Sequence, residues 1–156
     1  MIVDVQNGFI SRSTEHIPAL VESAQKDYDV VYATRFYNPT GSFFRTLIKW
    51  NRLGRDSSEF ALAFRLEVGG TIIDKPIYTC VDKLFVAGLR GQNISVVDVC
   101  GIDTDICVTK CAVDLFESGI EPRVLARLCA SNAGQEAHEH ALRTLERYIG
   151  KGQVIR

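Results

Sequence analysis

The feature that most limits the fold of this chain is an almost continuously apolar run of seven residues, Ile94–Cys100. A strand of this kind is typical of a parallel sheet, in which helices cover both faces. The run is far shorter than the roughly 20 apolar residues that cross a bilayer, and no longer apolar run exists. We therefore expect Ile94–Cys100 to lie in the middle of a layered structure.

Shorter apolar runs alternate with segments of helical periodicity along the rest of the chain. Strands are expected at Ile2–Val5, 30–34, 71–73, 94–100, 123–126 and 153–155, and helices at 17–27, 42–50, 84–89, 106–118 and 135–149. Such alternation predicts βαβ units. We therefore predict an α/β fold, a three-layer α/β/α sandwich with a mainly parallel, Rossmann-like central sheet. Residues 1–156 have the size of one domain, and we expect them to form a single one.

Composition and charge exclude several classes of function. The 18 basic and 19 acidic residues give a net charge of −1, without any Lys/Arg run, so nucleic acid is not an expected partner. No segment suits a membrane, and the first residues do not read as a signal peptide. We expect a cytoplasmic protein that acts on a small molecule.

The five cysteines form neither a disulfide framework nor a zinc site by their spacing. No C-x-x-C pair occurs, and the three histidines lie far from the cysteines in sequence. We expect Cys80, Cys100, Cys111 and Cys129 to be free thiols in the core. Cys107 needs a separate argument.

Three side chains with useful chemistry follow predicted strands, where ligands bind in parallel sheets. Asp4 sits in an apolar strand, and a buried carboxylate needs partners. Cys107 lies near the start of a helix, where the dipole is expected to lower the pKa of its thiol. Lys75 would favour the thiolate if it lay beside Cys107. Each has a plain alternative: a turn-forming aspartate, a buried structural thiol and a solvated lysine.

Other catalytic patterns are missing. The chain has no dinucleotide-binding glycine fingerprint, no P-loop and no serine elbow. His138 and His140 fall among charged residues of the last predicted helix. We expect both histidines to face solvent rather than to assist Cys107.

Three segments together resemble the isochorismatase-like cysteine hydrolase superfamily over nearly the whole chain. They are Ile2–Phe9, Lys75 with the following Thr79–Val81, and Gly101–Leu115, which is similar to the family motif G-x-x-T-D-x-C-V-x-x-T-A-x-D-A. The resemblance implies a catalytic triad of Asp4, Lys75 and Cys107. It also implies a cis peptide between Ile102 and Asp103, and an oxyanion hole made by the backbone N–H groups of Asp103 and Cys107.

Two departures from relatives refine this picture. The stretch Thr34–Pro39 lacks the carboxylate and imidazole with which nicotinamidases bind a metal, so we expect no metal and no cofactor, and nicotinamidase activity is disfavoured. Isochorismatases lack the nucleophilic cysteine that this chain has, which favours C–N cleavage. Phe9, Phe36 and Tyr37 are candidates for the pocket wall, and Arg35 for contact with an anionic substrate group.

The resemblance therefore predicts a cysteine-dependent hydrolase of a small amide, ureido or carbamoyl C–N bond that works through a thioester acyl-enzyme. Family members commonly form dimers or tetramers, so a homo-oligomer is expected. The alternative is a non-catalytic or redox-sensing oligomeric binding protein with the same fold.

Overall fold

All six strands pair in parallel in one sheet, in the order β3-β2-β1-β4-β5-β6, in a computed structural model that describes residues 1–156. The strands are β1 (Ile2–Val3), β2 (Tyr32–Phe36), β3 (Thr71–Lys75), β4 (Val96–Ile102), β5 (Glu121–Ala130) and β6 (Val154–Ile155). The helices are α1 (Ile17–Ala24), α2 (Phe43–Thr46), α3 (Lys83–Gly91), α4 (Thr109–Glu117) and α5 (Gln135–Tyr148). The predicted α/β fold with a parallel, Rossmann-like sheet is confirmed.

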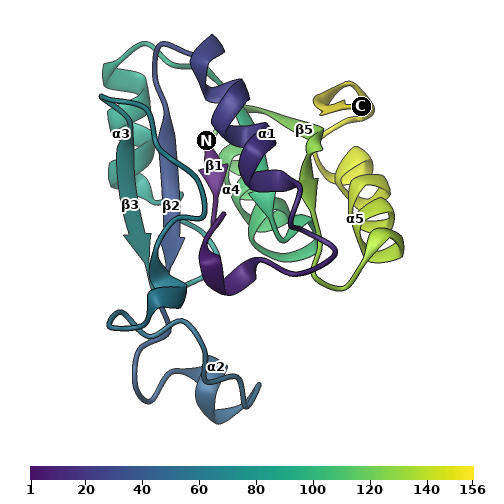
Figure 1. Cartoon of the computed structure of the whole chain (residues 1–156). Helices are drawn as coiled ribbons and strands as arrows, with labels where there is room; N and C mark the ends of the chain where they lie inside the picture. Colours follow the sequence, from purple (N-terminus) through teal and green to yellow (C-terminus); the bar gives the residue numbers. More distant parts are fainter.

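Helices cover both faces of the sheet, as the apolar character of β4 requires. In Figure 1, α1 lies in front of the sheet, whereas α3 and α4 lie behind it. The core between these layers contains completely buried side chains such as Val3, Val99 and Leu115. The four cysteines that we assigned to the core, Cys80, Cys100, Cys111 and Cys129, are all buried and free.

Helix boundaries follow from local capping chemistry. The Asp82 carboxylate accepts a hydrogen bond from the Phe85 N–H at 2.8 Å, which satisfies one of the unpaired donors at the start of α3. Pro18 occupies the first turn of α1, where its missing N–H is no loss. Helix α4 is followed by Gly119 at φ +72°, the predicted position of a glycine that ends a helix.

Several strands end about two residues before or after the predicted position. Strand β1 ends at Val3 because Asp4 takes a left-handed conformation with φ +50°. Strands β3 and β4 continue to Lys75 and Ile102. The helix predicted to begin at Ile106 instead starts as a π-helical turn, Thr104–Val108, and becomes α-helical at Thr109.

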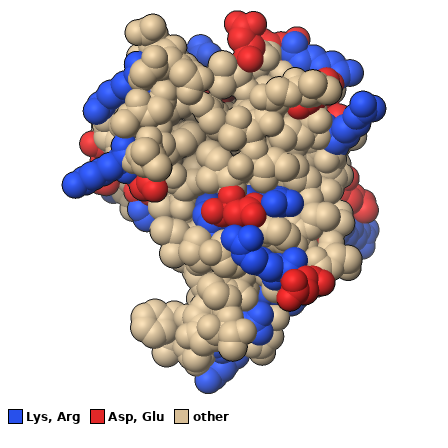
Figure 2. All heavy atoms as spheres, turned by 90° about the vertical axis from the view of Figure 1, so that its left-hand side faces the viewer, with Lys and Arg blue, Asp and Glu red and all other residues tan.

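The segment around α2 projects from the body of the molecule below the carboxyl ends of β2 and β3 (Figure 1). The helix predicted at 42–50 is reduced to the four residues of α2. Phe43 is 76% exposed and Leu47 is 71% exposed. Figure 2 shows that the projecting lobe is mostly uncharged on this side. None of the helices is long and apolar enough to cross a membrane.

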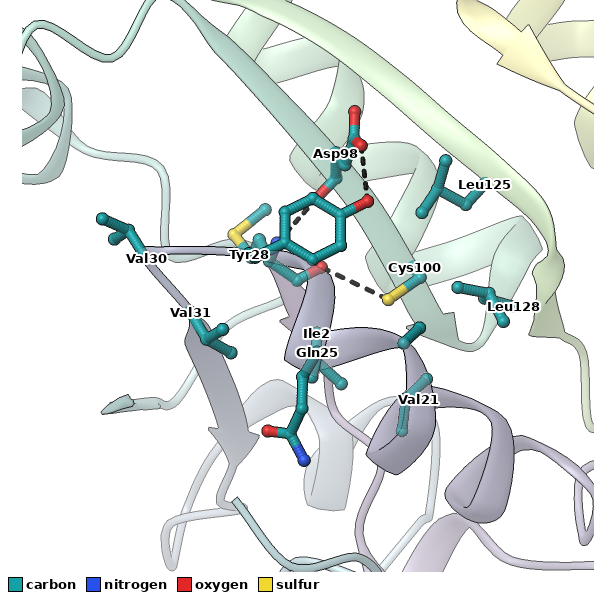
Figure 3. A pocket seen from close by; sticks show the side chains of 12 residues that line it. Ile2, Val21, Gln25, Tyr28, Val30, Val31, Asp98, Cys100, Leu125 and Leu128 are labelled. Atoms are coloured by element: carbon teal, nitrogen blue, oxygen red, sulfur yellow. Dashed lines mark hydrogen bonds between the residues drawn. The ribbon is translucent and has the colours of Figure 1, made fainter. Parts of the chain in front are cut away.

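A small cavity lies toward the other end of the sheet, between α1 and the residues that precede β2 (Figure 3). Its volume is about 20 Å³, and it is bordered by Val21, Tyr28 and Cys100. This is room for about one water molecule. A substrate must therefore bind elsewhere.

Gly101 supplies the first testable prediction. Its φ is +124°, and a Cβ atom there would lie 2.1 Å from the Val3 carbonyl oxygen of the neighbouring strand. We expect Gly101→Ala to lower the free energy of unfolding by about 3 kcal/mol or more, measured by urea denaturation. The matched control is Gly88→Ala in α3, where nothing lies within 4 Å of the added Cβ. That control should gain roughly 0.5–1 kcal/mol, and equal stability of the two variants would contradict the account.

Candidate active site

Three strand ends bring the predicted catalytic side chains together. The strand order reverses between β1 and β4, and parallel sheets bind ligands at such a point. Asp4 follows β1, Lys75 ends β3, and Cys107 follows β4 by a few residues. Lys75 Nζ donates to Asp4 Oδ2 at 2.5 Å, and the charges of both groups act on the Cys107 thiol.

The Asp4 carboxylate is completely buried and is held in place from two sides. Its Oδ1 accepts a hydrogen bond from Thr34 Oγ1 at 2.6 Å, while its own N–H donates to the same hydroxyl oxygen at 3.1 Å. Thr34 lies on β2, between the strands that supply Asp4 and Lys75. Thr34 therefore fixes the orientation of the carboxylate.

The Lys75 ammonium uses all three of its donors. Besides Asp4, it donates to the carbonyl oxygens of Ile77 at 3.2 Å and Tyr78 at 2.9 Å, and the residue is only 3% exposed. Burial disfavours the charged form, but the nearby Asp4 carboxylate and the Cys107 sulfur raise the pKa of Lys75 above its ordinary value. Lys75 therefore stays charged and supplies a fixed positive charge rather than a base.

The Cys107 thiol behaves differently from the expectation based on the helix dipole. Burial raises its pKa well above the ordinary value, the Asp4 carboxylate raises it further, and Lys75 lowers it only in part. The reason is that the charge of Lys75 is already balanced by Asp4, which leaves burial as the dominant effect. The thiol is therefore protonated at rest and needs a base in order to react.

The turn that carries Cys107 is tightly wound. The peptide between Ile102 and Asp103 is cis. The N–H groups of Ile106 and Val108 both donate to the Asp103 carbonyl oxygen at 3.1 Å. The Asp103 N–H itself makes no hydrogen bond within the chain, so it is available to a ligand.

Residues after β5 clamp this turn from the side. Asp103 Oδ1 accepts hydrogen bonds from the Asn132 N–H at 2.8 Å and from Asn132 Nδ2 at 2.9 Å. Asn132 Nδ2 also donates to the Phe9 carbonyl oxygen at 3.0 Å. Burial raises the pKa of Asp103 to about 6, although the hydrogen bonds from Asn132 oppose this shift.

A pocket of about 470 Å³ opens beside the Cys107 turn. Its wall is mainly apolar and contains packed aromatic rings: Phe9 stacks on Trp50 at 5.8 Å between ring centroids, and Phe36 meets Phe44 edge-on at 4.9 Å. The lining residues are Gly8, Phe9, Phe36, Phe44, Ile48, Lys49, Trp50, Arg52, Tyr78, Asp103, Ile106, Cys107 and Asn132. This volume suits a small organic molecule.

Two residues that we assigned to the pocket do not line it. Arg35 points away because successive residues of β2 face opposite sides of the sheet, and Thr34 and Phe36 take the inner positions. Its Nε donates to Asp74 Oδ1 at 2.8 Å. Tyr37 stacks instead under Arg55, whose guanidinium carbon lies 3.9 Å from the ring centroid. Phe9 and Phe36 do line the pocket.

Other residues of this region were missed or misjudged from the sequence. His138 was expected to face solvent, but it is buried, and its Nδ1 is 2.8 Å from Thr104 Oγ1 at the start of the Cys107 turn. Asn132 could have been found, because it follows β5, the neighbour of β4. The residues around Phe44 and Trp50 contain no pattern that predicts a place in the pocket. These two side chains reach the pocket only because the projecting segment around α2 folds back toward it.

The side chains near the pocket do not fit a metal ion. No group of three or more His, Cys, Asp or Glu side chains is arranged to hold one. Asn38 lies in the stretch after β2. Its Nδ2 donates to the Trp50 carbonyl oxygen at 2.8 Å, and its Oδ1 accepts a hydrogen bond from Ser42 Oγ at 2.5 Å. The reaction steps proposed below use only side chains and backbone groups of this chain.

The chain is thus an α/β protein with a parallel sheet covered on both faces, and a pocket lined by Cys107 lies at the carboxyl ends of its strands. The sequence matches the isochorismatase domain family over residues 1–153. The chain therefore belongs to this family and is a hydrolase of the isochorismatase-like type. No curated protein matches the sequence.

Solved structures share the fold at low sequence identity. The pyrazinamidase of Pyrococcus horikoshii, solved in complex with zinc, is 20% identical with a TM-score of 0.80 and is matched over 99% of this chain and 94% of its own. The nicotinamidase of Bacillus subtilis is 22% identical with a TM-score of 0.83, over 99% and 97%. An isochorismatase-like hydrolase from Alkaliphilus metalliredigens is 16% identical with a TM-score of 0.84, over 99% and 91%.

The buried ion pair gives the second prediction. Lys75→Met leaves the Asp4 carboxylate buried without its cation, so we expect the free energy of unfolding to fall by about 3–5 kcal/mol in urea denaturation. The double variant Asp4→Asn/Lys75→Met removes the stranded charge and should be clearly more stable than Lys75→Met alone. Equal stability of the single and double variants would show that the two charges do not depend on each other.

Asp103 gives the third prediction. Because burial raises its pKa from 3.8 to about 6, the folded protein holds this proton more tightly than the unfolded chain does. The contribution of Asp103 to stability is therefore present at low pH and lost as the pH rises from 3.8 to about 6. We expect Asp103→Asn to be more stable than the wild type at neutral pH by about 2 kcal/mol. Urea unfolding should show this difference shrinking as the pH falls toward 3.8, and a difference independent of pH would contradict the assignment.

Proposed function

We propose that this protein hydrolyses a C–N bond of a small amide, ureido or carbamoyl compound, with Cys107 as the nucleophile. The observation that carries the proposal is the Asp4 carboxylate, held by Lys75 at 2.5 Å and Thr34 at 2.6 Å, whose charge acts on the pocket-lining Cys107 thiol. A protonated thiol beside a fixed carboxylate is the arrangement that general-base activation of a nucleophile requires.

The first half of the reaction forms a thioester. As the substrate binds, Asp4 takes the thiol proton and the sulfur attacks the carbonyl carbon. The negative charge that develops on the carbonyl oxygen meets the N–H groups of Asp103 and Cys107, each worth roughly 3–4 kcal/mol in comparable sites. Asp4 then gives its proton to the nitrogen, the C–N bond breaks and the amine leaves.

The second half releases the product. Water enters the space that the amine has left, and Asp4 removes one of its protons as the oxygen attacks the thioester carbon. The C–S bond breaks, the acid leaves and Cys107 regains its proton. Throughout both halves Lys75 remains charged, so that the carboxylate of Asp4 has a stable partner whenever it is ionised.

The names of the solved relatives are in keeping with C–N cleavage. Pyrazinamidase and nicotinamidase are named for amide substrates.

The redox-sensing alternative is less well supported. Thiols that sense oxidants are accessible and have a low pKa. Cys107 is only 6% exposed, and burial raises the pKa of its thiol. This combination suits a nucleophile that is activated only when a substrate is bound.

Removing the sulfur of Cys107 is the fourth prediction. We expect Cys107→Ala to lower kcat/KM by about 10³-fold or more, measured as ammonia release across a panel of small amides and ureas. Cys100→Ala is the matched control, because it removes an equally buried thiol that contacts the Met1 carbonyl oxygen and does not line the pocket. Turnover by Cys107→Ala at the wild-type rate would reject the nucleophile.

A further inference from the structure

The Asp103 carboxylate has one oxygen that the fold does not use. Its Oδ1 accepts two hydrogen bonds from Asn132, whereas Oδ2 has no hydrogen-bond partner in the chain. Yet Oδ2 is not sealed in the interior, since Asp114 Oδ2 is the only fully buried side-chain oxygen or nitrogen without a partner. Asp103 is 9% exposed and lines the pocket. Oδ2 is therefore an unpaired and partly accessible oxygen on a side chain that lines the pocket.

No cation compensates this carboxylate. None of the ion pairs of the protein includes Asp103. A largely buried carboxylate without a cation is unfavourable, and the hydrogen bonds from Asn132 offset only part of that cost. Asn132 in turn is anchored on the Phe9 carbonyl oxygen at 3.0 Å. The carboxylate is thus held in a fixed orientation with an acceptor to spare.

Asp103 is the only carboxylate that lines the pocket, and Asp4, which does not line it, is already assigned to the thiol and the leaving nitrogen. The pocket wall is mainly apolar, and its remaining charged residues are the cations Lys49 and Arg52. Arg52 is itself paired with Glu59 at 2.7 Å. A hydrogen-bond donor on a bound substrate would therefore be met by Asp103.

The backbone N–H of Asp103 indicates which N–H of the substrate lies next to the Asp103 carboxylate. The Asp103 N–H is unpaired and is one of the two donors proposed for the carbonyl oxygen. A carbonyl group held there lies next to the Asp103 side chain. A urea-type carbonyl presents an oxygen acceptor and a flanking N–H donor side by side, whereas a simple carboxamide has a carbon on that flank.

We propose that Asp103 selects ureido and carbamoyl compounds by accepting, through Oδ2, a hydrogen bond from the N–H that stays on the scissile carbonyl. The reaction is the one in Proposed function, on which this selection rests. Cys107 Sγ bonds to the carbonyl carbon and the other nitrogen leaves as an amine, so the enzyme carries an S-carbamoyl group whose N–H remains on Asp103. Water then breaks the C–S bond, which restores the thiol and releases a carbamic acid.

The fifth prediction compares two probes that differ in one group. Phenylurea and phenylacetamide both release ammonia, but the atom between ring and carbonyl is N–H in the first and CH₂ in the second. In Asp103→Asn, Asn132 holds the side-chain oxygen, so the new NH₂ faces the pocket and repels the substrate N–H. We expect the ratio of kcat/KM for phenylurea to kcat/KM for phenylacetamide to fall by about 10- to 100-fold, as for the loss of a hydrogen bond to a charged group.

Asp29→Asn is the control, because this exposed carboxylate lies in the turn before β2, away from the pocket. It should leave the ratio of the two probes unchanged. An equal loss on both probes in Asp103→Asn would overturn the selection by Asp103 while leaving the nucleophile intact. Wild-type turnover by Cys107→Ala would instead overturn the proposed function.

Binding to an inactive protein keeps the test decisive if neither probe is turned over. In calorimetric titration, Cys107→Ala should bind phenylurea, and adding Asp103→Asn should weaken that binding about 10-fold or more. Unchanged phenylurea affinity in the double variant would overturn the proposal. Because Asp103→Asn is expected to stabilise the fold, thermal melting separates a loss of recognition from a loss of structure.

Discussion

The buried pair of Asp4 and Lys75 is the interaction on which the site depends. Two charges taken out of water are unfavourable unless geometry and hydrogen bonds compensate. Here Thr34 holds one carboxylate oxygen, and two backbone carbonyl groups hold the ammonium. Both charges are therefore satisfied before any substrate arrives. A consequence is that Lys75 lowers the pKa of the Cys107 thiol only in part, and burial keeps that pKa well above its ordinary value.

The order of the strands makes this pair possible. Asp4 and Lys75 come from β1 and β3, which are separated by β2. The long lysine side chain reaches across the end of β2, and its Nζ lies 5.6 Å from the centre of the Phe36 ring. The close approach of β1 and β4 at Gly101 then brings the Cys107 turn to the same edge.

The sequence predicted the parts of the site that follow from strand ends and a long motif. Asp4, Lys75 and Cys107 are far apart in the chain, but each follows an apolar strand, and the carboxyl ends of parallel strands share one edge. The direction of the Cys107 pKa shift was predicted wrongly, because the pattern shows a helix start but not how deeply the sulfur is buried. Arg35 was assigned to the pocket because the strand was predicted to end at residue 34. Strand β2 in fact ends at Phe36, so Arg35 lies within the strand and its side chain faces the side opposite to Thr34 and Phe36.

If Asp103 has the role that we propose, stability and function oppose each other at this edge of the sheet. A buried acid with one unused oxygen lowers stability at neutral pH, and nothing in the packing requires it. The most direct test of the central claim is intact-mass and peptide mass spectrometry of protein quenched within its first turnovers on an activated amide. The account predicts an acyl adduct on the peptide that contains Cys107. An adduct on another cysteine, or turnover without any adduct, would contradict it.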